Sequence, residues 1–105
     1  MIRDIFTEKV IKLIKQIPSG KVATYGQISF LAGDDSSGAR QVARILHSCT
    51  EKENLPWHRI INSKGCISLK GEAYKLQREM LESEGIVFDE SGQVDFKRFL
   101  WIPGY

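Results

Sequence analysis

Apolar residues recur at spacings of three and four between Asp4 and Ile17, which is the period of an amphipathic helix. Lysines at positions 9, 12 and 15 fall on the opposite, polar face. The stretch Pro18-Ser19-Gly20 ends the pattern, because proline and glycine stop helices. This pattern predicts a helix over residues 4–17 and favours a mainly α-helical fold.

Two shorter helices are predicted next. Thr24 is followed three residues later by Gln27, the capping-box spacing that satisfies two backbone donors at a helix start. We therefore expect a helix over residues 25–32, ending at Gly33. A turn over residues 34–37 leads to a third helix, predicted over residues 38–47.

The third helix has one apolar and one basic arc when residues are placed at 100° intervals. Ala39, Val42, Ile45 and Leu46 form the first, and Arg40, Ala43, Arg44 and His47 form the second. Two short helices in series, the second with a basic face, favour a helix-turn-helix whose second helix meets nucleic acid. A solvated basic face on a core helix explains this one helix equally well.

The second half of the chain predicts smaller elements. Residues 48–55 are polar and predict a connecting loop, and residues 58–61 and 66–69 flank a turn as in a hairpin that would serve as a wing. Helical periodicity returns over residues 72–84, and Gly85 is a candidate C-cap. The apolar tail, residues 94–105, is expected to dock on the domain. The fold class predicted is mainly α with a small β-hairpin, of the winged-helix type.

Length and composition limit the alternatives. A chain of 105 residues supports one modest core, so residues 1–105 are predicted to form one domain, with residues 89–105 as an extension packed on it. The net charge of +2 does not by itself identify a nucleic-acid partner.

Cys49 and Cys66 show no metal-ligand spacing with the two histidines, so we expect free thiols, no metal and no cofactor in a cytoplasmic protein. We expect no signal peptide, and no apolar run reaches the length of a membrane span.

The motif Pro56-Trp57-His58-Arg59-Ile60 is the candidate functional centre. A proline restricts the backbone before a large aromatic side chain, and two potentially cationic side chains follow. Alone, this motif would also suit a loop that buries a tryptophan in a core. Its neighbours favour a cleft.

Four sequence blocks, in this order, resemble the DNA-binding domain of the O6-alkylguanine-DNA alkyltransferases. The blocks are Ile17-Pro18-x-Gly20-Lys21-Val22-x-Thr24-Tyr25-Gly26-Gln27-Ile28, Gly38-Ala39-Arg40-x-Val42, Pro56-Trp57-His58-Arg59-Ile60 and Leu81-x-x-Glu84-Gly85. They cover residues 4 to about 88, and four ordered blocks are far more specific than any one of them. The resemblance implies a helix-turn-helix domain that enters the minor groove.

The residue between proline and histidine departs from the enzymes of this family. In those enzymes a cysteine at this position accepts the alkyl group, whereas this chain has Trp57. An indole cannot replace a thiolate nucleophile, because its nitrogen lone pair belongs to the aromatic system. The chain therefore resembles more closely the alkyltransferase-like proteins, which bind the lesion without repairing it and direct it to nucleotide excision repair.

The resemblance implies a role for each matching residue. Arg40 matches the arginine finger that fills the gap left by an extruded nucleotide, and Tyr25 matches the tyrosine that promotes base rotation. Ala39, Ala43 and Arg44 match positions of the recognition helix that enter the minor groove.

The motif around Trp57 is expected to form a lesion pocket with Tyr25, Trp57, His58 and Arg59. His58 and Glu84 match the hydrogen-bonded pair that activates the cysteine in the enzymes, and here we expect them to be a structural pair. Arg59 is expected to brace the loop.

The implied partners are duplex DNA containing O6-alkylguanine and excision-repair proteins, with the chain acting as a monomer and associating with the nucleoid when bound. Two alternatives remain open at this stage. One is residual alkyl transfer to Cys66 or Cys49, and the other is a winged-helix regulator that recognises a DNA sequence.

Overall fold

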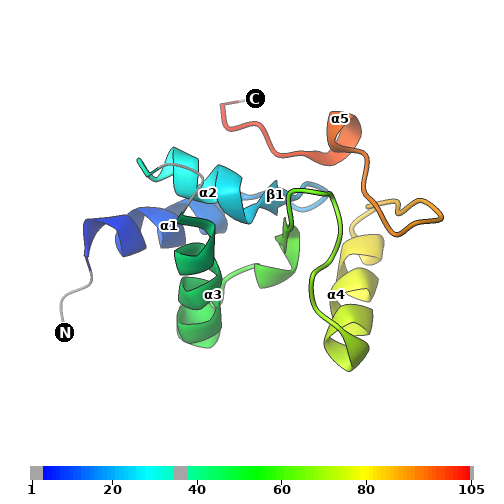
Figure 1. Ribbon diagram of the computed structural model, residues 1–105, viewed down its shortest axis with the longest axis horizontal. Coiled ribbons are helices and arrows are strands. Elements are labelled where there is room, and N and C mark those ends of the chain that lie inside the picture. The colour runs from blue at the N-terminus through cyan, green and yellow to red at the C-terminus, as the bar shows by residue number, and fades with distance from the viewer. Residues whose placement is uncertain (1–3, 35–37, 105) are drawn as a thin grey trace.

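The computed structural model describes residues 4–34 and 38–104. Helix α1 (Ile5–Gln16) leads into the short strand β1 (Ala23–Thr24), helix α2 (Tyr25–Leu31) and helix α3 (Ala39–Glu53). A 3-10 turn, η2 (Trp57–Arg59), then enters strand β2 (Ile60–Ile61), followed by helices α4 (Gly71–Ser83) and α5 (Phe96–Phe99). In Figure 1, α3 and α4 lie on either side of the segment that carries η2 and extend toward the bottom of the view. The C-terminal tail runs along the top of the view. The mainly α-helical fold predicted above is confirmed.

The N-terminal helices form where their local signals predict. Asp4 caps α1 by accepting a hydrogen bond from the backbone of Thr7 at 2.7 Å. Thr24 Oγ1 accepts from Gln27 N at 3.0 Å, and Gln27 Oε1 accepts from Thr24 N at 3.2 Å, which completes the capping box of α2. These caps satisfy backbone donors that a helix start leaves unpaired.

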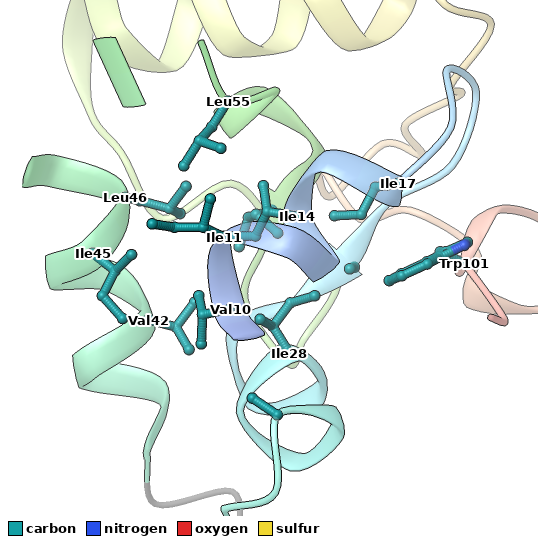
Figure 2. Packing of buried hydrophobic residues seen from close by; sticks show 13 residues of the cluster. Val10, Ile11, Ile14, Ile17, Ile28, Val42, Ile45, Leu46, Leu55 and Trp101 are labelled. Carbon is teal, nitrogen blue, oxygen red and sulfur yellow. The ribbon is translucent and has the colours of Figure 1, made fainter. Parts of the chain in front are cut away.

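Helices α1, α2 and α3 enclose the larger of two apolar clusters. Figure 2 shows side chains of α3 pointing toward those of α1, with Trp101 from the C-terminal tail beside Ile17. Ile14 and Val42 are fully buried, and Trp101 is 7% exposed. The buried members of this cluster are Val10, Ile11, Ile14, Ile17, Ala23, Ile28, Ala32, Val42, Ile45, Leu46, Leu55, Ile60 and Trp101.

The second apolar cluster joins α4 to the region of β1 and β2 and to the chain that follows α4. Its buried members are Val22, Ile61, Ile67, Leu81, Ile86, Val94 and Phe99. The tail is held on this side by backbone hydrogen bonds, with Val22 N donating to Phe99 O and Trp101 N donating to Val22 O. The apolar tail therefore docks on the molecule, as its composition predicts. Tyr105 lies outside the described residues.

The predicted hairpin between residues 58–61 and 66–69 is wrong. Strand β2 instead pairs in parallel with β1, with Ala23 opposite Ile60 and Thr24 opposite Ile61. After β2, the Asn62 side chain accepts hydrogen bonds from the backbone of Lys64 and Cys66, which closes a tight turn. The return segment over residues 66–69 forms no strand.

The predicted loop over residues 48–55 is also wrong in part, because α3 continues to Glu53. Cys49 packs against the larger apolar cluster, and Lys15 Nζ of α1 forms an ion pair with Glu53 Oε1 at 3.0 Å. Asn54 then ends the helix in a left-handed conformation with φ 53°. The helix thus continues through residues whose composition is polar and meets α1 near its end.

Candidate nucleic-acid interface

A cavity of about 630 Å³ lies between α3 and α4, and most of its surface is apolar. Helix α3 contributes one wall, with Ala39, Arg40, Ala43, Leu46, His47 and Thr50. The facing lining residues are Tyr25, Trp57, Ser68, Leu69 and Gln77. Such a volume is in the range of pockets that bind small organic ligands.

The junction of α2 and α3 places this wall. Gly38 is the N-cap of α3 and is buried against α2, so that a Cβ atom at this position would overlap Ser29 Oγ and lie 2.7 Å from Asp34 Oδ2. No larger residue fits without displacement of these groups. On the other side of α2, Gln27 Nε2 donates to Trp101 O at 2.7 Å, which ties the helix to the C-terminal tail.

The predicted DNA-binding residues divide into two groups. Tyr25, Ala39, Arg40 and Ala43 all line the cavity, and Arg40 and Ala43 are exposed. Arg44 is also exposed but lies on another flank of α3, beside a smaller depression of about 290 Å³. The basic face predicted from the sequence therefore has one arginine at the cavity and one outside it.

The predicted lesion-pocket residues divide in a similar way. Tyr25 and Trp57 line the cavity, whereas His58 and Arg59 are absent from its described lining. His58 is only 7% exposed and makes an edge-to-face contact with the Trp57 ring, with centroids 6.2 Å apart. His58 therefore contacts residues of the cavity wall without lining the cavity itself.

Glu84, the C-cap of α4, collects the hydrogen bonds that hold the η2 turn. His58 Nε2 lies 2.8 Å from Glu84 Oε2, and Arg59 Nη2 donates to the same oxygen at 2.7 Å. Gly20 N donates to Glu84 Oε1 at 3.2 Å. Arg59 Nη1 also donates to Ile17 O at 2.8 Å. One carboxylate thus joins η2, α4 and the chain that follows α1.

These contacts determine the ionisation of Glu84. Burial by itself raises the pKa of a carboxyl group, but the hydrogen bonds from Arg59, His58 and Gly20 outweigh it and lower the pKa of Glu84 to about 2. Glu84 is therefore ionised at neutral pH and accepts a hydrogen bond from His58 Nε2. His58 Nδ1 is buried and has no hydrogen-bond partner among the described residues.

Comparison with known proteins identifies the family. A profile described as "6-O-methylguanine DNA methyltransferase, DNA binding domain" matches residues 5–86. The chain belongs to this methyltransferase DNA-binding family.

Several members of the family are similar over nearly the whole chain. A "DNA base-flipping protein" of Escherichia coli K12 is 42% identical over 98 residues, which cover 93% of this chain and 75% of the relative. "Alkyltransferase-like protein 1" of Schizosaccharomyces pombe is 35% identical over 106 residues, covering 95% of this chain and 97% of the relative.

Solved structures of the family share the fold. The crystal structure of the Schizosaccharomyces pombe protein in complex with damaged DNA containing O6-carboxymethylguanine has a TM-score of 0.78 at 35% identity and covers 98% of this chain and all of that one. The O6-methylguanine methyltransferase of Mycobacterium tuberculosis has a TM-score of 0.61 at 26% identity, over 79% of this chain and half of that one.

Five residues that line the cavity of this family member were missed by sequence reasoning. They are Leu46, Thr50, Ser68, Leu69 and Gln77. His47, on the basic arc predicted from the sequence, also lines the cavity. Helix α4 turns a different face inward than its apolar spacing suggests, since Gln77 is 2% exposed whereas Leu76 is 51% exposed. The available signal was the spacing of Gln77, which lies four residues before the buried Leu81 and therefore on the same face of α4.

Other features of this family member lie away from the cavity. Cys49 and Cys66 are free thiols, and neither belongs to the described cavity lining. Within residues 4–34 and 38–104, no cluster of histidine, cysteine or acidic side chains is arranged to hold a metal ion. None of the helices described there combines the length and the apolar character that a membrane crossing requires.

Proposed function

We propose that this chain is a non-enzymatic sensor of DNA damage that binds O6-alkylguanine in duplex DNA by extruding the base into the cavity between α3 and α4. The observation that carries the proposal is that Tyr25, Arg40 and Trp57 meet at one apolar cavity of about 630 Å³. The relatives named for base flipping and the related complex with damaged DNA support it.

The wall formed by α3 is suited to close contact with a duplex. Ala39 and Ala43 are small and lie on the cavity side of the helix, with Arg40 exposed between them. Minor-groove binders open base steps with inserted side chains and need the backbone to come close. Arg40 would then occupy the space of the extruded nucleotide.

The chemistry of the lesion favours extrusion. Alkylation at O6 removes the N1 proton of guanine and weakens its base pair, which lowers the unpairing cost of a few kcal/mol. An aromatic side chain that stacks on a base contributes about 1–3 kcal/mol. Trp57 would supply this contact in the cavity, with Tyr25 at its edge.

In this proposal, the protein leaves the alkyl group on the base and directs the lesion to nucleotide excision repair. Trp57 stands where the family resemblance places the acceptor cysteine, and it offers no nucleophile. Cys49 lies by the smaller depression on the other flank of α3, and the Cys66 thiol contacts the backbone carbonyl of Lys64. Intact-protein mass spectrometry after incubation with methylated DNA should show no added methyl group, and a gain of one methyl per chain would establish alkyl transfer instead.

An electrophoretic mobility-shift titration tests lesion binding directly. Duplexes that differ only in O6-methylguanine or guanine at one position are compared at the same salt concentration, because phosphate contacts make affinity salt-dependent. We expect tighter binding to the O6-methylguanine duplex. Equal affinity for both duplexes would reject the proposal, and enrichment of a sequence motif from random duplexes would favour a sequence-specific regulator.

A further inference from the structure

Gln77 is the buried polar side chain of the cavity wall contributed by α4. Its Nε2 donates to His58 O at 3.0 Å and to Ile60 O at 2.9 Å, and the residue is 2% exposed. The two carbonyls flank the end of the η2 turn, so Gln77 holds the backbone that carries Trp57. Nothing in the roles implied by the family resemblance includes this residue.

These two hydrogen bonds fix the orientation of the Gln77 amide. A primary amide has two N–H donors on nitrogen and an acceptor oxygen. Exchange of Nε2 and Oε1 would set an acceptor oxygen against two carbonyl oxygens, so the network decides the assignment. Both N–H groups are occupied, and any further hydrogen bond must be made by Oε1 as an acceptor.

The acceptor oxygen is not completely enclosed by the described residues. No described residue donates a hydrogen bond to Gln77 Oε1, yet this oxygen is not among the fully buried atoms without a partner. The small exposed surface of Gln77 therefore includes Oε1, and Gln77 lines the cavity. An oriented acceptor in a largely apolar cavity selects a ligand that carries an N–H or O–H donor.

We infer that Gln77 is a specificity-determining residue that accepts a hydrogen bond from the exocyclic amine of the extruded guanine. O6-alkylation removes N1–H, and N9 is bonded to the sugar, so the C2 amine is the N–H donor that remains on the alkylated base. The other polar ring positions are acceptors, which Gln77 Oε1 does not bind. This inference rests on the proposed function, since it requires a base in the cavity.

The test compares two lesions that differ only in this amine. Duplexes carry O6-methylguanine or O6-methylhypoxanthine, which lacks the C2 amine, and affinities are measured by mobility shift for wild type, Gln77→Met and Gln77→Lys. Methionine removes both the donor and the acceptor of Gln77. Lysine keeps donors for the His58 and Ile60 carbonyls but has no acceptor. Each protein is scored by the ratio of its two affinities, so that a general change in DNA binding or folding cancels.

Wild type should prefer O6-methylguanine by about tenfold, which is the usual effect of one buried hydrogen bond. Both variants should lose this preference. Gln93→Met, at an exposed position in the chain before α5, is the matched control and should keep the wild-type ratio. A variant that retains the tenfold preference, or a wild type without it, would overturn the role of Gln77. Failure of wild type to distinguish O6-methylguanine from guanine would instead reject the proposed function.

Discussion

Arg59 and Glu84 form a two-pronged ion pair at the end of α4. Arg59 Nε lies 3.0 Å from Glu84 Oε1, and Arg59 Nη2 lies 2.7 Å from Glu84 Oε2. Both side chains are largely buried, at 18% and 14% exposed. Because Arg59 directly follows His58 in the η2 turn, this pair holds the segment that presents Trp57 to the cavity.

Replacement of Glu84 should destabilise the protein strongly. In Glu84→Gln, Arg59 loses its counter-ion, and breaking a buried pair from one side costs about 3–5 kcal/mol, less where the pair is partly solvated. We expect a loss of about 2–4 kcal/mol in the free energy of unfolding, measured by urea denaturation. Glu82→Gln is the control, because Glu82 forms an exposed pair with Arg78, and it should change stability by less than about 1 kcal/mol. Similar effects of the two substitutions would contradict the role given to Glu84.

Glu84 should also determine much of the acid sensitivity. Its pKa is about 2 in the folded state, against an ordinary value of 4.5, so the folded state is stabilised when the carboxyl group is ionised. This stabilisation, about 3 kcal/mol, is present above pH 4.5 and is lost as the pH falls toward 2. Thermal unfolding of wild type between pH 6 and pH 2 should show this decline. Glu84→Gln should flatten it, and an unchanged slope in the variant would place the acid sensitivity elsewhere.

The close approach at Gly38 predicts a substitution that α3 does not tolerate. A methyl group in Gly38→Ala would overlap Ser29 Oγ, and overpacking of this kind typically costs about 1–3 kcal/mol. Urea denaturation should show a loss of this size. Gln41→Ala, at an exposed position of the same helix, should remain within about 0.5 kcal/mol of wild type. A fully stable Gly38→Ala protein would mean that α2 and α3 can separate without penalty.

The two arginines of α3 should affect DNA binding differently. Arg44 lies outside the cavity, so Arg44→Ala should weaken binding to damaged and undamaged duplexes alike and reduce the slope of log affinity against log salt by about one, as for a phosphate contact. Arg40 lines the cavity, so Arg40→Ala should lower the preference for the lesion itself. Salt titrations with both duplexes separate the two effects. The same loss on both duplexes for Arg40→Ala would exclude it from base extrusion.

Trp57 should contribute through its aromatic face. Trp57→Ala removes the ring at the cavity and should weaken binding to O6-methylguanine DNA by about 1–3 kcal/mol, whereas Trp57→Phe should retain most of the affinity. Binding to the guanine duplex serves as the internal reference. Equal weakening by alanine and phenylalanine would indicate that the indole acts through its N–H group or its size instead of stacking.

Local chemistry accounts for the helices that could be predicted. The capping box at Thr24 and Gln27, the proline and glycine after α1 and the apolar spacing of α1 act over a few residues, so the sequence contains them completely. The motif order likewise placed Tyr25, Arg40 and Trp57 as candidates for one site, and all three line the cavity. His58 and Glu84, 26 positions apart, were paired by family resemblance alone, and they lie 2.8 Å apart.

The errors arose where segments distant in the sequence come into contact. Residues 66–69 carry the signals of a hairpin strand. However, β2 pairs with β1, which lies 37 residues earlier in the sequence, and Ala23 is opposite Ile60. Helix α3 continues beyond its apolar pattern to Glu53, which forms an ion pair with Lys15 of α1. Gln77 was overlooked because a glutamine has no apolar signal, and its burial follows from two carbonyls brought to it by η2 and β2. Helix starts and the candidate motif were thus properties of neighbouring residues, whereas the end of α3, the strand pairing and the cavity lining depend on which distant segments meet, since their energies come from long-range packing and hydrogen bonds.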